Sequence, residues 1–252
     1  MTFALAVAGK GGSGKTSLAS LIIRYLLNHT QGTILAVDAD ANANLGEGLG
    51  LSVGQTIGSI IASFNEAKIN IPPGMTKEAY LEIKLNEAVT ESQRLDLITM
   101  GRGEGRACYC YPNTVLRNFI DRLAENYDYI VMDNEAGMEH LSRRTTQNID
   151  NLLLVSDHSV KGVRTLARIR ELVEELKLQV KKRSVVINFV PGQLDSYVAA
   201  ELERLGLEAA ALIPMDDNIK RYDLEQKSLL DLPDDSPAVR AVARLMSKVL
   251  IY

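Results

Sequence analysis

The chain has few cysteines, no long apolar run and little excess charge. Two cysteines, Cys108 and Cys110, are too few for a disulfide-stapled secreted scaffold. No stretch approaches the ~18 apolar residues that span a bilayer, and the N-terminus lacks the basic flank and cleavage site of a signal peptide. A net charge of −4 gives no electrostatic reason to expect nucleic acid or an anionic membrane as a partner. We therefore expect a cytoplasmic protein that binds neither.

Apolar runs, many of them β-branched, alternate with stretches of helical periodicity along the 252 residues, and 46% hydrophobic residues can fill a sizeable core. Strands are predicted at Phe3–Ala8, Thr33–Val37, Leu95–Thr99, Tyr129–Met132, Asn151–Val155, Ser184–Phe189 and Ala209–Ile213. Helices are predicted at Thr16–Asn28, Pro112–Glu125, Val160–Leu176, Asp195–Leu205 and Pro237–Leu250. The alternation predicts an α/β fold in which residues 1–252 form a single domain, a doubly wound, mostly parallel sheet with helices on both faces.

Residues 63–92 interrupt this alternation. They contain a turn at Ile71–Gly74 and then a mixed polar helix near Thr76–Ala88. We predict an insertion on the rim of the sheet. A surface excursion is the favoured interpretation because the segment carries no chemical motif, and a docking surface for a client protein is the alternative.

The segment Gly9–Thr16 fits the pattern G-x-x-x-x-G-K-[ST] between a predicted strand and a predicted helix, which is the context that a phosphate-binding loop requires. Backbone N–H groups of the turn and the start of the helix would surround the phosphates. We expect Lys15 to reach the β- and γ-phosphates and Thr16 to offer its hydroxyl to Mg²⁺. The other candidates for nucleotide contact in this loop are Gly11, Gly12, Ser13, Gly14 and Ser17.

A second lysine, Lys10, stands near the start of the loop, where it would point away from the phosphates of its own nucleotide. A solvated lysine is the ordinary interpretation. The sequence K-G-G-x-G-K-T, however, resembles the deviant Walker A motif of the P-loop NTPases that include MinD, ParA and the nitrogenase iron protein. In that class this lysine reaches across a dimer interface to the partner's nucleotide. The resemblance therefore implies a nucleotide-dependent homodimer in which Lys10 and Lys15 both serve catalysis.

Acidic residues follow two predicted strands, at the edge where such a sheet binds its ligand. Asp38 and Asp40 lie in a segment that resembles the family's switch I, although Ala41 replaces its usual proline. The match implies that Asp40 positions or activates the attacking water and that Asp38 supports the Mg²⁺ shell. Asp133 ends a strand as in a Walker B element and should hold magnesium through water. Gly137 resembles the switch II glycine whose N–H detects the γ-phosphate.

Recognition of the base rests on weaker signals. Asn188 matches an asparagine that family members place against adenine. The segment Pro214-Met215-Asp216 follows the next strand, where backbone contacts to the base are usual in the family, and Pro214 and Asp216 are the candidates in it. Ordinary turns are the alternative for both segments. The resemblance alone favours ATP and ADP, and the guanine motif N-K-x-D is missing after Asn188.

The cysteines are separated by one residue, Tyr109. In an extended segment, residues i and i+2 project from the same face, so the thiolates of Cys108 and Cys110 could bind one metal ion. A twofold dimer would supply four sulfurs, a set that suits Zn²⁺, Ni²⁺ or an iron–sulfur cluster. Incidental thiols or a redox pair are equally compatible with the C-x-C pattern by itself.

The wider sequence is more specific. Cys108–Cys110, Pro112-Asn113 and Leu116-Arg117, followed by D-N-E-A-G-M-E-H from Asp133 and S-R-R from Ser142, closely resemble the CooC/AcsF family of nickel-insertion ATPases. These ATPases mature carbon monoxide dehydrogenase or acetyl-CoA synthase, and the resemblance spans nearly the whole chain. It implies a Mg²⁺-dependent ATPase whose homodimer holds Ni²⁺, or Zn²⁺ in its place, through the cysteines. ATP-linked closure would then pass the metal to a client nickel enzyme.

Three other classes stay open. An iron–sulfur reductase like the nitrogenase iron protein would use well-separated cysteines, one of them just beyond switch II, whereas these two are adjacent. A scaffold for cluster assembly would use a C-x-x-C pair, with a longer spacer than the one present. A MinD- or ParA-like positioning ATPase would need a membrane-binding tail or a basic DNA face, and the amphipathic helix Pro237–Leu250 fits ordinary core packing.

Overall fold

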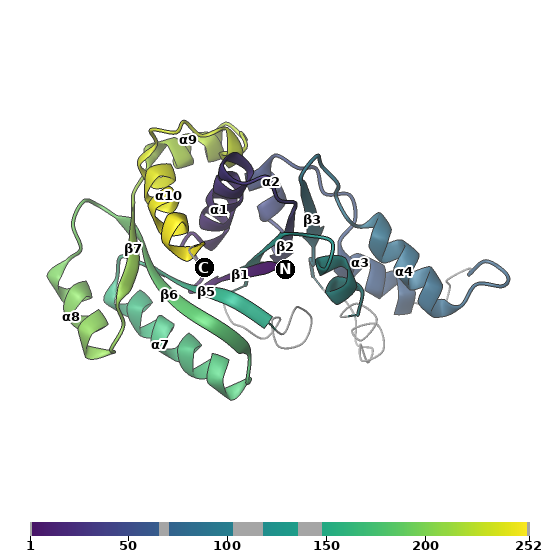
Figure 1. The fold of residues 1–252 in the computed structure, drawn as a ribbon, viewed down its shortest axis with the longest axis horizontal. Coiled ribbons are helices and arrows are strands. Elements are labelled where there is room, and N and C mark those ends of the chain that lie inside the picture. Colours follow the sequence, from purple (N-terminus) through teal and green to yellow (C-terminus); the bar gives the residue numbers. More distant parts are fainter. Residues whose placement is uncertain (1, 66–70, 103–117, 136–147, 251–252) are drawn as a thin grey trace.

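The computed structural model describes residues 2–65, 71–102, 118–135 and 148–250. Its centre is a seven-stranded sheet with the order β3-β2-β4-β1-β5-β6-β7, and all pairs of neighbouring strands in it run parallel (Figure 1). The strands are β1 (Phe3–Gly9), β2 (Ile34–Ala39), β3 (Leu95–Thr99), β4 (Tyr129–Asn134), β5 (Asn148–Asp157), β6 (Gln179–Val190) and β7 (Ala209–Pro214). The predicted doubly wound α/β fold is confirmed.

Helices cover both faces of the sheet because successive side chains of a buried strand point to opposite sides. On β1, Leu5 and Val7 contribute to the core on one face, and Ala4, Ala6 and Ala8 to the core on the other. The first face is covered by α1 (Lys15–His29), α2 (Leu45–Leu49), η1 (Leu229–Asp231) and α10 (Pro237–Val249), with α9 (Asp217–Leu224) beside them. The second face carries α3 (Ile57–Asn65), α4 (Lys77–Glu87), a helix at 118–124, α7 (Val160–Glu175) and α8 (Ser196–Arg204).

The rim segment forms two helices, α3 and α4, which lie beyond β3 at one end of the molecule (Figure 1). The first begins at Ile57, earlier than the predicted start of the insertion, and the second is capped by the Thr76 hydroxyl, which accepts from the Ala79 N–H at 3.1 Å. Ile60 and Leu81 belong to the same core as the sheet. The segment is therefore packed against the main fold, and its role as a docking surface stays a prediction.

Sequence periodicity found the long elements and missed the short ones. All the predicted strands form, and α1, α7, α8 and α10 lie within two residues of their predicted bounds. The helix at 118–124 lies inside the predicted Pro112–Glu125, whose first residues fall outside the described part. The short helices α2 and α9 were not predicted, because neither shows an apolar period. Helix α2 has five residues, two of which are glycines, and none of the eight residues of α9 is buried. Across the described residues, no helix is long and apolar enough to cross a membrane.

A buried arginine fixes the chain after α9 to α1. Arg24 on α1 donates to the carbonyl oxygens of Leu230 at 3.1 Å and Leu232 at 2.6 Å. It also forms an ion pair with Asp234 at 2.7 Å. The guanidinium thus satisfies acceptors that the turn into α10 leaves free, in a fork geometry that lysine cannot reproduce.

Arg24→Met should destabilise the fold by about 2–3 kcal/mol, since methionine keeps the apolar stem but leaves the Leu232 carbonyl without its donor. Urea unfolding measures the loss. Arg240→Met, an exposed arginine on α10, is the matched control and should change stability by about 0.5 kcal/mol or less. Equal urea midpoints for the two variants would contradict the anchoring role.

Candidate functional site

The phosphate loop joins β1 to α1 at the carboxyl edge of the sheet. Gly12 and Gly14 have φ angles of 75° and 78°, in the left-handed region that favours glycine. Ser13 closes the turn, because its N–H and hydroxyl both donate to the Lys10 carbonyl oxygen, at 3.2 and 2.8 Å. Helix α1 begins directly at Lys15 and has no acidic residue in its first turn. The free N–H groups at its start are therefore available to an anion.

The two lysines of the loop point in different directions. Lys15 is buried, and its ammonium donates back to the Lys10 carbonyl oxygen at 3.3 Å, so it lies over its own loop. The side chain of Lys10 is exposed and forms an ion pair at 3.6 Å with Asp157, at the end of β5. Lys15 is therefore directed into the loop, whereas Lys10 is directed toward solvent.

Two carboxylates stand side by side at the same edge. Asp38 on β2 and Asp133 on β4 are paired in the strand register, so their side chains project to the same face, the one covered by α1. Asp38 is buried and accepts from the N–H groups of Leu45 at 2.9 Å and Asp40 at 3.1 Å. Burial raises its pKa to about 6, although these two bonds favour the charged form.

Asp133 is 1% exposed, and neither of its carboxylate oxygens has a hydrogen-bond partner. Burial raises the pKa of Asp133 to about 7, and the charge of Asp38 raises it further. The nearby Thr16 hydroxyl and the Lys15 ammonium lower this pKa, although the hydroxyl does not reach the geometry of a full hydrogen bond. Buried acceptors without donors are costly unless a cation or water satisfies them. Oxygen ligands from a carboxylate and a hydroxyl suit Mg²⁺, so Asp133 and Thr16 fit a hydrated magnesium ion.

Asp40 lies where the edge opens to solvent. Its Oδ1 atom accepts from the backbone N–H of Asn42 at 2.8 Å and from the side-chain amide of Asn42 at 3.0 Å. The carboxylate is partly exposed, in contrast to Asp38 and Asp133. Asp40 is therefore accessible from solvent without any change in the core.

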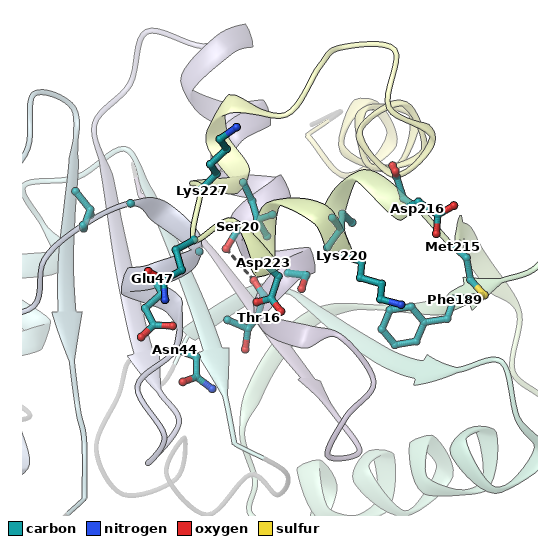
Figure 2. Close-up of a pocket in the computed structure, with 18 of the residues that line it drawn as sticks. Thr16, Ser20, Asn44, Glu47, Phe189, Met215, Asp216, Lys220, Asp223 and Lys227 are labelled. Carbon is teal, nitrogen blue, oxygen red and sulfur yellow. Dashed lines mark hydrogen bonds between the residues drawn. The ribbon is translucent and has the colours of Figure 1, made fainter.

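A cavity of about 840 Å³ extends from the phosphate loop toward α9 (Figure 2). Thr16 and Ser17 lie at its loop end. Its walls come from α2, from the ends of β6 and β7, and from α9, and include Glu47, Phe189, Met215, Asp216, Lys220 and Asp223. Sequence reasoning missed Phe189 and Lys220, and it reached Met215 only as part of the segment Pro214–Asp216. Phe189 is the last residue of a predicted strand, and Lys220 lies in a helix that was not predicted.

Of the predicted base-contacting residues, Asp216 lines this cavity, and Asn188 and Pro214 are the chain neighbours of the lining residues Phe189 and Met215. The side chains of Asn188 and Asp216 are engaged within the protein. Asn188 is buried, and its amide donates to the Ser13 carbonyl oxygen at 3.0 Å and accepts from the Phe189 N–H at 2.9 Å. Asp216 caps α9 through the Asn218 N–H at 3.0 Å and α10 through the Ala238 N–H at 2.9 Å. Pro214 ends β7. Contacts from these residues to a base stay predictions.

Three predicted site residues, Cys108, Cys110 and Gly137, lie outside the described residues. The described chain before the cysteines follows β3, and the described chain before Gly137 follows β4. Both strands end at the edge that holds the phosphate loop. The structure therefore does not test the roles predicted for these three residues.

A parallel sheet with a phosphate loop after its central strand and carboxylates on neighbouring strands defines a P-loop nucleotide-binding protein. Residues 4–229 match the model of the CobQ/CobB/MinD/ParA nucleotide binding domain, and the chain belongs to this family.

Individual relatives agree with this assignment. The chain is 40% identical over 248 residues to an uncharacterized ATP-binding protein of Methanocaldococcus jannaschii, with 98% of each chain covered. It is 25% identical over 259 residues to the carbon monoxide dehydrogenase accessory protein CooC of Rhodospirillum rubrum, covering 98% of this chain and 95% of that one. Its fold is similar to that of Pyrococcus horikoshii MinD complexed with Mg-ADP, with a TM-score of 0.72 at 19% identity, covering 100% and 97% of the two chains.

Asp133→Asn is expected to stabilise the ligand-free protein at neutral pH. The pKa of Asp133 in the folded state, about 7, lies above the ordinary value of 3.8, so the folded state binds more protons between these values. The free energy of unfolding of the parent protein therefore falls as the pH rises through this window, and asparagine removes that loss. We expect a gain on the order of 2 kcal/mol near neutral pH that shrinks toward pH ~4.

Thermal unfolding in EDTA across this pH window measures the effect. Asp235→Asn, an exposed aspartate before α10, is the control and should follow the parent protein at every pH. A stability difference between Asp133→Asn and the parent that does not vary with pH would show that burial of the Asp133 charge is not its source.

Proposed function

We propose that this chain is a Mg²⁺-dependent ATPase that forms a nucleotide-controlled homodimer and inserts nickel into carbon monoxide dehydrogenase or acetyl-CoA synthase. The observation that carries the ATPase is the buried Asp133 carboxylate, which lacks hydrogen-bond partners and stands between Thr16 and Asp38. A site that keeps an unsatisfied buried carboxylate beside a phosphate loop suits a metal-bound triphosphate.

Each residue of the site has a separate task in this proposal. Lys15 and the N–H groups at the start of α1 bind the phosphates, and Thr16 with Asp133 holds Mg²⁺. The ion, when bound, neutralises charge on the phosphate oxygens. Asp40 orients the attacking water from the open side of the site. Lys10 contacts the nucleotide of the partner subunit.

Metal delivery is supported by the C-x-C pair within its wider motif and by the 25% identity to CooC of Rhodospirillum rubrum along nearly the full length. Cys108 and Cys110 from two subunits would give four thiolates, which suit Ni²⁺ and Zn²⁺. The chain reaches Cys108 after β3, whose Thr99 is the register partner of Asp38. In this proposal, β3 would couple the nucleotide site to the segment that carries the cysteines.

A membrane-positioning role is less well supported. The apolar side of α10 is buried against the sheet, including Val242, Leu245 and Met246. That side is therefore not available for a lipid surface in the described fold.

Lys15→Ala and Asp40→Ala should separate binding from hydrolysis. Loss of the Lys15 ammonium should weaken ATP binding roughly 100-fold, because charge-assisted contacts to the phosphates disappear. Loss of the Asp40 carboxylate should leave ATP affinity nearly unchanged and slow hydrolysis on the order of 100-fold. Calorimetry and phosphate release measure the two effects, with the exposed Lys161→Ala on α7 as the control. Parent-like hydrolysis by Asp40→Ala would remove Asp40 from its assigned task.

Replacing both cysteines, Cys108→Ser/Cys110→Ser, should abolish nickel binding and client activation while ATP hydrolysis continues. Serine hydroxyls are poor ligands for Ni²⁺ compared with thiolates. Metal analysis combined with light scattering, with ADP and with ATP, should show one nickel per two chains for the parent protein and none for the variant. Tyr109→Phe keeps the spacing and both thiols and is the control. Unchanged nickel stoichiometry in the double variant would refute the metal site.

A further inference from the structure

Three large side chains, Phe189, Met215 and Lys220, line the cavity where β6 and β7 end (Figure 2). Phe189 follows Asn188 on β6, Met215 follows β7, and Lys220 comes from α9. Phe189 is 38% exposed and Met215 is 61% exposed. Apolar groups that line a cavity and remain open to solvent indicate a surface that binds another molecule.

The backbone of Phe189 is strained. Its φ angle is 58°, in the left-handed region that a bulky residue rarely adopts and that costs on the order of 1–2 kcal/mol. Asn188 holds it there, because the amide oxygen of Asn188 accepts the Phe189 N–H at 2.9 Å. Local strain of this kind persists where the surrounding structure imposes it, and it concentrates at ligand sites.

The aromatic ring is fitted to the phosphate loop. A Cβ atom at Gly14 would lie 2.7 Å from Phe189 Cζ and 2.4 Å from Asn188 Nδ2, so only glycine allows this approach. The amide of Asn188 also donates to the Ser13 carbonyl oxygen at 3.0 Å. One asparagine therefore fixes both the loop and the ring, and the ring lies beside Gly14, the residue that precedes α1.

We propose that Phe189 is the platform on which the base of the bound nucleotide stacks, and that Asn188 acts by positioning this ring. The proposal rests on nucleotide binding at the phosphate loop. Met215 and Lys220 flank the ring and complete the slot. Because every base presents a π-face, a stacking platform recognises ring shape and tolerates different exocyclic groups. The slot therefore takes adenine and guanine nucleotides alike, and selectivity between them has to come from other contacts.

Calorimetry with Mg²⁺ and three probes, ATP, GTP and inorganic tripolyphosphate, tests the platform. Phe189→Ala should weaken ATP and GTP binding by a similar factor, roughly 10-fold or more, and leave tripolyphosphate binding unchanged. Phe189→Tyr should keep the parent affinities. Tyr197→Ala removes a 78% exposed ring on α8 that does not line the cavity, and it should leave all three affinities unchanged.

Phe189→Gly distinguishes a binding role from a packing role, since glycine adopts the same φ without strain. We expect its unfolding temperature to equal or exceed that of the parent while ATP affinity still falls. Parent-like ATP affinity for Phe189→Ala, or a parallel loss of tripolyphosphate binding, would overturn the platform. A parent protein that binds tripolyphosphate no better than Lys15→Ala and binds no nucleotide would instead overturn the proposed function, and the platform with it.

Discussion

The parallel pairing of β4 with β1 on one side and with β2 on the other is the constraint on which the site depends. In this register, Asp133 lies opposite Val7 on β1 and opposite Asp38 on β2. The loop that follows β1 therefore begins beside two carboxylates that project to the same face. A slip of one residue would turn Asp133 to the other face and bring Asn134 into its place, and the site would lose its only buried carboxylate next to Thr16 among the described residues.

The two carboxylates meet the cost of burial in different ways. Asp38 is compensated by two N–H donors, one of which belongs to the start of α2, so its charge is part of the local fold. Asp133 has no such donor. Within the protein the Thr16 hydroxyl and the Lys15 ammonium favour its charged form, but burial outweighs them and raises its pKa. A cation that binds beside Asp133 therefore stabilises the folded state by its free energy of binding. Occupancy of the site and stability of the core are thus linked through one side chain.

The sequence was most informative where local signals decide the structure. The phosphate loop and the buried strands are defined by glycine spacing and apolar runs, and the structure has them at the predicted positions. Features that depend on contacts between distant residues could not be predicted from the sequence. Asp216 starts α9 and also accepts from Ala238 on α10, and the strained φ of Phe189 depends on an amide that itself holds Ser13. No periodicity in the chain encodes the contacts of Asp216 with Ala238 and of Asn188 with Ser13, because each joins residues far apart in sequence.

The proposed dimer requires Lys10 to exchange one partner for another. Its present partner, Asp157, is partly exposed and 3.6 Å away, and surface pairs of this kind contribute about 0–1 kcal/mol. A triphosphate carries more charge than one carboxylate, so the exchange costs little and favours the nucleotide when a second subunit presents it. Lys15 is buried over its own loop and has no such freedom. One short loop therefore holds both a fixed, buried lysine and an exposed one, and the proposed dimer assigns the first to the loop's own nucleotide and the second to the nucleotide of the partner subunit.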